Sequence, residues 1–414
     1  MIQYAEEFSL ATCVCLNVTD NCNLACKYCF VHQKPHFMTL QTAKDSVDFV
    51  VKNLLTKEEL GLLEKPDEMA TITFFGGEPT LLWEEIVVPT VQYAEEKYAN
   101  LIQFNMTTNG TLLNQARIDF LQEHNIPILL SIDGNKAIQD VNRPCKNGLS
   151  SFDMVAPNIP LILNALPDTT FRATLNQDNC KGLFENTYLF AIQQGFGHIF
   201  MCPNAREEWT EDNLEILHNE INKIWTYIAF SFLNDEEPIS CTSVDAAFEN
   251  VLRLDLQNYY QEYENINPNR KVIRCGLGTS SFSIGYDGKI FACQEQDSRD
   301  TNDYFYIGDI YNGIDREKHL QIIQDYWKNA TIKNKNSQKC DSCELRQVCI
   351  EETCPSVSYD CFGNFFIRPT VDCLFHTWMF ENAIIVMDML VSENNVTFKK
   401  YLERIYSSYL KEGK

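Results

Sequence analysis

The sequence predicts an α/β fold built on a partial (β/α)6 TIM-like barrel, followed by a small cysteine-rich α+β region and C-terminal helices. Six short apolar or β-branched runs alternate with amphipathic stretches in the first half of the 414 residues. This is the order of a parallel sheet with helical crossovers. The 17 cysteines gather mainly near residues 22–29 and 340–373, which places chemistry at both ends of the chain.

The predicted strands are 12–19, 70–76, 102–109, 127–133, 170–176 and 197–202, and the clearest helical patterns between them are 39–55, 84–99 and 114–125. The near-continuous apolar strands fit a sheet that is buried on both faces. The loops after parallel strands share one rim, where such folds carry their chemistry. Each distinctive motif of this chain follows a predicted strand, so we expect the site at that rim.

Four regions are predicted. A partial barrel spans 1–235, a connecting helical segment 236–272, a cysteine-rich domain 273–380, and a helical tail 381–414. In the third region, "YDG" predicts a hairpin turn in which Gly288 takes a positive φ.

Composition excludes several classes of function. The net charge of -23 argues against nucleic acid as a partner, because phosphate contacts need clustered Lys and Arg. The sequence shows no apolar run that suggests a membrane span and no signal peptide, so we expect a cytoplasmic protein. Disulfides are disfavoured in the cytoplasm, and clustered thiols there indicate metal or redox chemistry.

The stretch "CNLACKYCF" holds three thiols with the spacing Cys22-x3-Cys26-x2-Cys29. These positions would share one face of a helix, and a packed helical seam is the plain alternative. The turn-forming residues Asp20 and Asn21 before Cys22 disfavour that helix. Three thiolates can hold three irons of a [4Fe–4S] cluster and leave the fourth iron open to a ligand.

This motif, with the aromatic Tyr28 before the last cysteine and its place after the first strand, resembles the radical S-adenosylmethionine (SAM) superfamily. The resemblance implies that the open iron binds SAM. One electron then cleaves SAM to methionine and a 5′-deoxyadenosyl radical, which abstracts a hydrogen atom from the substrate. It also implies an anaerobic oxidoreductase in which Cys22, Cys26 and Cys29 are the catalytic cluster ligands.

The loops after the next strands extend the resemblance. "GGEP" matches the family loop that contacts the methionyl amine of SAM, and "NRPCKNG" resembles the stretch whose Arg binds the carboxylate. For Thr108, Asn109, Ser131, Asp133 and Arg143 a structural turn role is the alternative. The predicted cofactor-binding residues are Tyr28, Gly76, Gly77, Glu78, Pro79, Thr108, Asn109, Ser131, Asp133 and Arg143.

The second group of cysteines resembles the SPASM extension, which carries two auxiliary [4Fe–4S] clusters; an all-thiolate zinc site is the alternative. The resemblance implies Cys275, Cys293 and Cys354 for one cluster, and Cys340, Cys343, Cys349 and Cys373 for the other. Either Cys361 is the fourth ligand of the first cluster, or one iron of that cluster is open to a substrate thiolate. Three clusters are therefore expected in all.

A packing role is expected for Cys13 and Cys15, which alternate along the first predicted strand with apolar neighbours. Cys145 is expected to be an exposed bystander in its loop.

SPASM-bearing relatives mostly act on peptides or proteins. Sulfatase maturation to formylglycine uses an Asp directly after the cysteine that matches Cys293, where this chain has Gln294. Gln is not titratable, and Glu295 or Asp297 would have to replace that Asp. We therefore favour a maturase that forms a thioether crosslink in a ribosomally made, cysteine-rich peptide. C–C or ether crosslinking and sulfatase maturation are the alternatives. An iron–sulfur electron carrier is the non-enzyme alternative, which the SAM-binding loops disfavour.

The expected partners are a precursor peptide and a reductant such as flavodoxin or ferredoxin. Only 21 residues precede Cys22, too few for a leader-recognition domain. A leader would then bind another surface of this chain or a separate leader-recognition protein, or the substrate has no leader. No nucleic acid and no membrane are expected.

Overall fold

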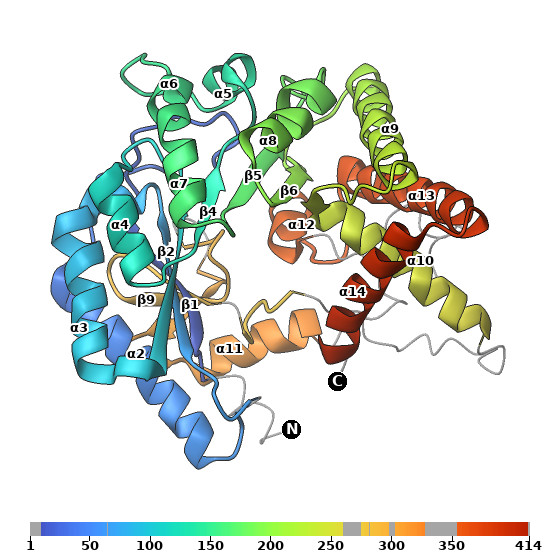
Figure 1. Ribbon diagram of the computed structural model, residues 1–414. Coiled ribbons are helices and arrows are strands. Elements are labelled where there is room, and N and C mark those ends of the chain that lie inside the picture. Colours follow the sequence, from blue (N-terminus) through green and yellow to red (C-terminus); the bar gives the residue numbers. More distant parts are fainter. Residues whose placement is uncertain are drawn as a thin grey trace. The chain divides into compact units, whose positions relative to one another are not determined.

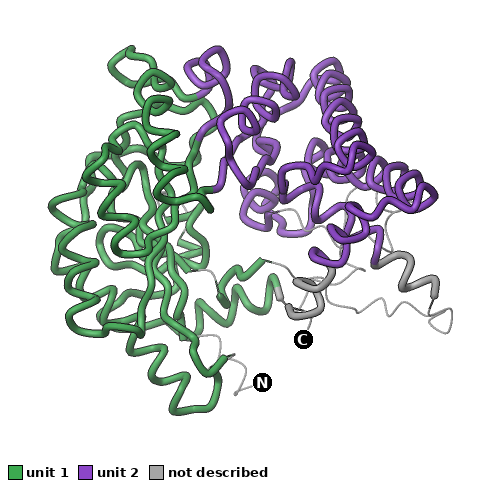
Figure 2. Tube along the Cα trace, in the orientation of Figure 1, with its two compact units in different colours: residues 1–131, 143–169, 273–330 green, residues 132–142, 170–272, 331–414 purple. Residues whose placement is uncertain are grey.

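The computed structural model describes residues 10–63, 65–259, 275–280, 282–297, 303–327 and 354–412, with only the backbone described for 253–259 and 406–412. The chain forms two compact units, shown in different colours in Figure 2. Unit 1 comprises residues 1–131, 143–169 and 273–330, and unit 2 comprises 132–142, 170–272 and 331–414.

The sheet of unit 1 has the strand order β11-β10-β9-β8-β1-β2-β3-β4. Its first four strands along the chain, β1 Cys13–Thr19, β2 Ala70–Gly76, β3 Ile102–Thr108 and β4 Ile128–Ser131, pair in parallel. They confirm the sequence prediction to within one or two residues. β8 Phe282–Ile284 pairs in parallel with β1, which was not predicted. The predicted hairpin then continues antiparallel through β9 Lys289–Phe291, β10 Tyr306–Asp309 and β11 Gly313–Ile314, and Gly288 has φ +84°.

The helices of unit 1 include α2 Leu40–Glu59, α3 Val88–Tyr98, α4 Gln115–Glu123, α6 Ser151–Val155, α7 Ile159–Ala165 and α11 Arg316–Ile322, which are labelled in Figure 1. α2 begins where predicted, because the Thr39 side chain accepts a hydrogen bond from the Thr42 N–H and caps the helix. α3 begins later than predicted, because two other helical turns, Pro79–Leu82 and Trp83–Val87, precede it.

The two faces of the unit 1 sheet differ in burial. Val14, Leu16 and Val18 of β1 are fully buried, and α2 contacts β1 and β2. The side chains on the other face are more polar: Cys15, Thr73 and Asn105 are partly exposed, whereas Asn17 is buried. The prediction of strands buried on both faces was therefore wrong, because one face carries polar side chains; we call it the inner face.

Unit 2 contains the parallel strands β5 Thr170–Leu175, β6 His198–Pro203 and β7 Ser240–Cys241, of which β5 and β6 were predicted. Its helices include α5 Lys136–Asn142, α8 Leu189–Gln194, α9 Glu211–Leu233, α10 Thr242–Tyr259, α12 Pro355–Phe362, α13 Thr370–Ser392 and α14 Val396–Glu412. α9, α10 and α14 share an aromatic core in which the Trp225, Phe248 and Phe398 rings pack edge to face.

Among the described helices, α13 alone is long and apolar enough to cross a membrane, with a mean hydropathy of 1.3. A core helix passes the same test, and α13 packs against α9 and α10 of its own unit. The Trp225 ring N–H, for example, lies 3.4 Å from the Met379 sulfur. One such helix is weak evidence for a membrane protein.

Candidate active site

The three-thiol loop follows β1, as predicted, and none of its three cysteines forms a disulfide. Cys22 is buried, Cys26 is partly buried and Cys29 is exposed. The Cys29 N–H donates to the Cys26 carbonyl at 3.1 Å, and the Leu24 N–H donates to the Cys22 sulfur at 3.3 Å. The loop is a series of turns with no helix, so the alternative of a packed helical seam was wrong.

The "NRPCKNG" segment packs on this loop. The Ala25 N–H donates to the Pro144 carbonyl at 2.8 Å, and the Arg143 guanidinium carbon lies 5.3 Å from the centre of the Tyr28 ring. The structure thus brings two predicted cofactor residues together within unit 1. Cys145 is buried in one packed cluster with Cys22, so the expectation of an exposed bystander was wrong. The expectation that Cys13 packs was also wrong, because Cys13 is exposed.

Gly76 and Gly77 lie against the end of β1, where side chains would not fit. A Cβ added to Gly77 would lie 2.1 Å from the Asn21 carbonyl oxygen. A Cβ on Gly76, which has φ +127°, would lie 2.3 Å from the Thr19 carbonyl oxygen. The Gly77 N–H donates to that same Thr19 carbonyl at 2.7 Å. The two glycines therefore hold the second loop directly against the start of the three-thiol loop.

The Glu78 carboxylate is buried and connects two loops. It accepts hydrogen bonds from the Thr108 hydroxyl at 2.7 Å, the Asn109 N–H at 2.8 Å and the Thr80 N–H at 3.1 Å. Burial raises its pKa, although these hydrogen bonds favour the charged form. Glu78 thus braces the loops after β2 and β3, and its contact with SAM stays a prediction.

Asn109 connects the loop after β3 to the three-thiol loop. Its amide donates to Asn23 Oδ1 at 3.0 Å and lies 3.8 Å from the Cys22 sulfur. Its Oδ1 accepts a hydrogen bond from the Thr111 N–H at 3.0 Å. The first and third loops of the rim are therefore joined beside Cys22.

Three cysteines on one loop fit a [4Fe–4S] cluster with one open iron, and the Leu24 N–H and the Asn109 amide supply the hydrogen bonds to sulfur that such clusters use. Burial raises the pKa of Cys22 to about 12, so the charge of the metal must remove the proton. In the part of the chain that the structure describes, no three His, Cys, Asp or Glu side chains lie close enough for one metal ion. A cluster distributes its thiolates over several irons.

The predicted auxiliary ligands fall in both units. Cys275 and Cys293 flank the β8–β9 hairpin of unit 1, where the Gly278 N–H donates to the Ala292 carbonyl at 3.0 Å, so both leave the hairpin at the same end. Cys354, Cys361 and Cys373 belong to unit 2 and form no disulfide, and Cys361 is exposed. Cys340, Cys343 and Cys349 lie outside the described residues. The auxiliary ligand sets therefore stay predictions.

Two further predicted cofactor residues lie near the next strand ends. Ser131 is partly exposed at the end of β4. Asp133, in unit 2, is buried and accepts a hydrogen bond from the Thr174 N–H at 3.1 Å through Oδ1. That bond gives Asp133 a structural role in unit 2, and its place beside the ribose or adenine stays a prediction.

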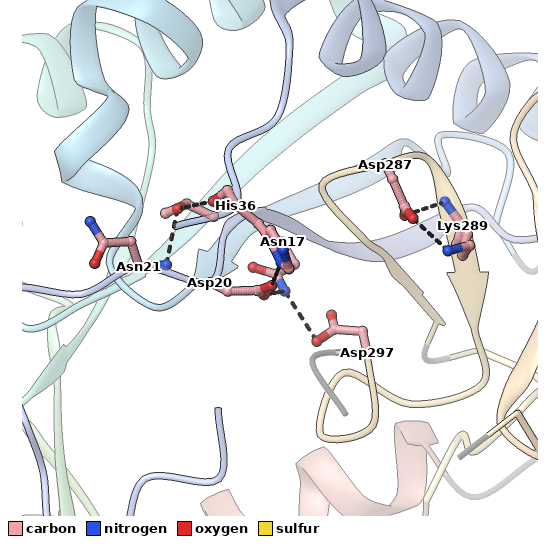
Figure 3. A network of polar contacts seen from close by, with 8 residues as sticks. Asn17, Asp20, Asn21, His36, Asp287, Lys289 and Asp297 are labelled. Carbon is pink, nitrogen blue, oxygen red and sulfur yellow. Dashed lines mark hydrogen bonds and ion pairs between the residues drawn. The ribbon is translucent and has the colours of Figure 1, made fainter. Parts of the chain in front are cut away.

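A polar network on the inner face of unit 1 was missed by the sequence prediction (Figure 3). The Asn17 amide donates to Asp20 at 3.0 Å and to Asp297 at 3.1 Å. Asp20 also contacts the His36 ring nitrogen at 2.8 Å. An Asn within the apolar strand "VCLNVT" was the signal that could have indicated it, because buried amides need partners.

Replacing Glu78 by Gln is expected to destabilise the protein by about 1–3 kcal/mol. Each carboxylate oxygen accepts from a backbone N–H, of Asn109 or Thr80, and the amide group of Gln would turn a donor toward one of them. Chemical denaturation measures the loss. Glu85→Gln, an exposed position in the same segment, is the control, and equal stability of both variants would contradict the bracing role.

The chain matches the model of the radical SAM superfamily over residues 16–178. It is 23% identical over 353 residues to the radical SAM cyclopropyl synthase TigE of Paramaledivibacter caminithermalis, covering 80% of this chain but only 65% of TigE. It is 36% identical over 223 residues to the uncharacterized protein MJ0907 of Methanocaldococcus jannaschii, covering 51% of this chain and 71% of that protein. It is 23% identical over 347 residues to a cysteine-type anaerobic sulfatase-maturating enzyme of Clostridium novyi, covering 80% of this chain and 84% of that enzyme.

Two solved structures have a similar fold. Native anSMEcpe with bound AdoMet and Cp18Cys peptide superposes with a TM-score of 0.67 at 19% identity, covering 92% of this chain and 99% of that chain. Streptococcus suis SuiB bound to the precursor peptide SuiA gives a TM-score of 0.53 at 15% identity, covering 90% and 78%. At these identities the likeness shows the α/β fold.

Proposed function

We propose, from the premise that the chain belongs to the radical SAM superfamily, that it is a maturase acting on a ribosomally made peptide. Members of this superfamily are enzymes whose cofactors are a [4Fe–4S] cluster and SAM. When bound, these cofactors supply a 5′-deoxyadenosyl radical that removes a hydrogen atom from the substrate. The observation that carries the proposal is the loop of three closely spaced cysteines after β1, which Gly77, Glu78 and Asn109 hold in place.

In this proposal Cys22, Cys26 and Cys29 hold the cluster. The backbone of Gly76 and Gly77 presents polar groups to the methionyl end of SAM, and Arg143, stacked on Tyr28, presents its guanidinium to the SAM carboxylate. The partly exposed polar side chains of the inner face, such as Thr73 and Asn105, offer hydrogen-bonding groups to a substrate.

A peptide substrate is supported by the relatives. The C. novyi relative is a sulfatase-maturating enzyme, and the anSMEcpe and SuiB structures contain bound peptides. We carry this substrate class to the present chain, together with the SPASM domain at 273–380 and its two auxiliary clusters. A cytoplasmic location, a flavodoxin- or ferredoxin-like reductant and a separate leader-recognition protein complete the proposal.

A thioether crosslink is the product that we favour, because an open auxiliary iron would hold a substrate thiolate ready for C–S bond formation. Formylglycine formation is the second candidate, and the match to 84% of the C. novyi enzyme favours it. Against it, the residue after Cys293 is Gln294, whose side-chain oxygen accepts a hydrogen bond from the Cys15 thiol at 2.6 Å. An amide in that contact supplies no base.

The test is anaerobic turnover of the reconstituted protein with SAM, dithionite and a synthetic cysteine-rich peptide encoded beside the gene. We expect 5′-deoxyadenosine together with a peptide that has lost about two hydrogens per event. Peptide thiols that resist alkylation would identify a thioether, thiols that still react would indicate a C–C or ether bond, and a new aldehyde would indicate formylglycine. Cleavage of SAM with every peptide unchanged would contradict the peptide-modifying function.

A further inference from the structure

The inner face of the unit 1 sheet carries no charge along its first three strands. Inward side chains alternate with buried ones along β1, β2 and β3, and the strand register aligns them in rows. The two rows nearest the strand starts are Cys13, Thr71 and Gln103, and then Cys15, Thr73 and Asn105. No inward position of these strands holds an acidic or basic residue, although 22% of the chain is charged. These rows therefore offer hydrogen bonds and no ion pair.

This face is accessible from the end where the strands begin. The first row is exposed at Cys13 and Gln103, whereas the second row is partly exposed. The Gln103 amide donates to the Thr71 hydroxyl at 3.0 Å. In contrast, the side chains of Thr73 and Asn105 form no hydrogen bond within the part of the chain that the structure describes. Their donors and acceptors are therefore available to a molecule that enters along the sheet.

The other end of the face meets the three-thiol loop. Phe75, the last inward residue of β2, stacks on Phe30 with the ring centres 6.2 Å apart, and Phe30 follows Cys29 directly. The distance along β2 from the first row to Phe75 is about 13 Å at the rise of a β-strand. An extended segment of about four residues thus reaches from the open end of the face to the three-thiol loop.

One margin of the face carries an acid. Asp297 lies where β1 meets β8 and accepts hydrogen bonds from the Asn17 amide at 3.1 Å and from the Ser283 hydroxyl (Figure 3). Two carboxylates that lie close together resist ionising together, so Asp297 disfavours an acidic residue beside it. Along the two rows, an acidic side chain would lose water and would meet no cation in the rows themselves.

We infer that this face binds an extended, uncharged segment of the peptide substrate, an inference that rests on the proposed peptide-modifying function. Thr73 and Asn105 determine the specificity, because a neutral polar face accepts backbone amides and small polar side chains and rejects carboxylates. The segment enters where the strands begin, and the residue to be modified lies toward Phe75 and the three-thiol loop. The partner is thus a peptide whose reacting stretch lacks charged residues.

The first test places a charge in the peptide. In the cysteine-rich peptide encoded beside the gene, Asp or its neutral isostere Asn replaces each of about four residues on either side of the modified one. We measure modified peptide per 5′-deoxyadenosine. At positions that lie on the face, Asp is expected to lower this ratio about 100-fold relative to Asn, because its charge is left uncompensated. Equal ratios for Asp and Asn at every position would overturn the inference.

The second test moves a compensating charge into the protein. Asn105→Lys is expected to raise modification of the Asp peptide about 10-fold and to lower modification of the Asn peptide. Gln41→Lys is the matched control and should change neither, because Gln41 is an amide exposed on α2, outside the sheet. An Asn105→Lys variant that treats both peptides as the wild type does would overturn the inference.

A third variant tests the hydrogen bonds alone. Thr73→Val keeps the shape of the side chain and removes its hydroxyl, so KM for the neutral peptide should rise about 5-fold while kcat stays unchanged. A KM equal to that of the wild type would contradict the contact of Thr73 with the peptide.

Failure of the inference and failure of the proposed function give different results. Wild-type protein that modifies the Asp and Asn peptides equally well overturns the inference and keeps the function. Wild-type protein that cleaves SAM and modifies no peptide overturns the function, and fluorescence anisotropy of the labelled peptides then judges the surface. Tighter binding of the Asn peptide, reversed in Asn105→Lys, would support the inference, whereas equal binding of the two peptides would overturn it.

Discussion

Replacing Cys22, Cys26 and Cys29 together by Ala is expected to abolish 5′-deoxyadenosine formation while leaving about two thirds of the iron. The three thiols lie on one loop, and the predicted ligands of the two auxiliary clusters lie elsewhere, from Cys275 onward. Removing the thiolates of the three-thiol loop should therefore remove one of the three expected clusters. Chromatography of the nucleoside products and iron analysis of the reconstituted protein measure the two effects.

Cys145→Ala is the matched control for this triple variant. Cys145 is buried in the same packed cluster as Cys22, and its thiol lies 3.7 Å from the Met154 sulfur. Its replacement removes one buried sulfur beside the loop, as the replacement of Cys22 does, without removing a predicted ligand. Iron content and SAM cleavage should therefore stay near the wild-type values. Persistent SAM cleavage in the triple variant would show that the radical cluster is held elsewhere.

The parallel strands could be predicted because their signal is local. Short β-branched runs that alternate with amphipathic stretches predicted β1 to β6 to within two residues. The pairing of β8 with β1 could not be predicted, because β8 has three residues and the contact spans more than 260 positions. Hydrophobic period carries no information about which distant strand a short segment joins.

The residue types of the site could be predicted from the sequence, but the contacts of their side chains could not. The thiol spacing and the two glycines indicated the loops that meet at the rim. The contact of Glu78 with the SAM amine stays a prediction, and the structure adds hydrogen bonds to its carboxylate from Thr80, Thr108 and Asn109 that the sequence did not indicate. A motif reports which residue is present, whereas the direction of its side chain depends on the donors that surround it.

The Asp297 network lay beyond sequence reasoning for a related reason. Asn17, Ser283 and Asp297 are unremarkable polar residues taken singly, and their meaning comes from the parallel contact of β1 with β8. That contact buries a carboxyl beside a second acid, which raises its pKa, while the hydrogen bonds from its two donors favour the charged form. Asp297 and Glu295 were both named from the sequence as possible replacements for the missing base, and that role stays a prediction.

Replacing Gly77 by Ala is expected to lower SAM cleavage by about 100-fold, because a shift of about 1 Å at a cofactor loop is enough for such a loss. The new Cβ would lie 2.1 Å from the Asn21 carbonyl oxygen, a backbone atom that cannot rotate away. Either the loop after β2 or the start of the three-thiol loop must move. Overpacking of this kind also costs about 1–3 kcal/mol of stability.

Gly197→Ala separates this steric effect from the general effect of removing a glycine. A Cβ at Gly197 meets no atom within 4 Å, so we expect a change in stability within about 0.5 kcal/mol and wild-type SAM cleavage. Iron content and nucleoside formation should be measured for both variants, since a displaced three-thiol loop should also retain its cluster poorly. Wild-type turnover by Gly77→Ala would mean that the second loop tolerates displacement, and that its contact with Asn21 does not position the cofactor.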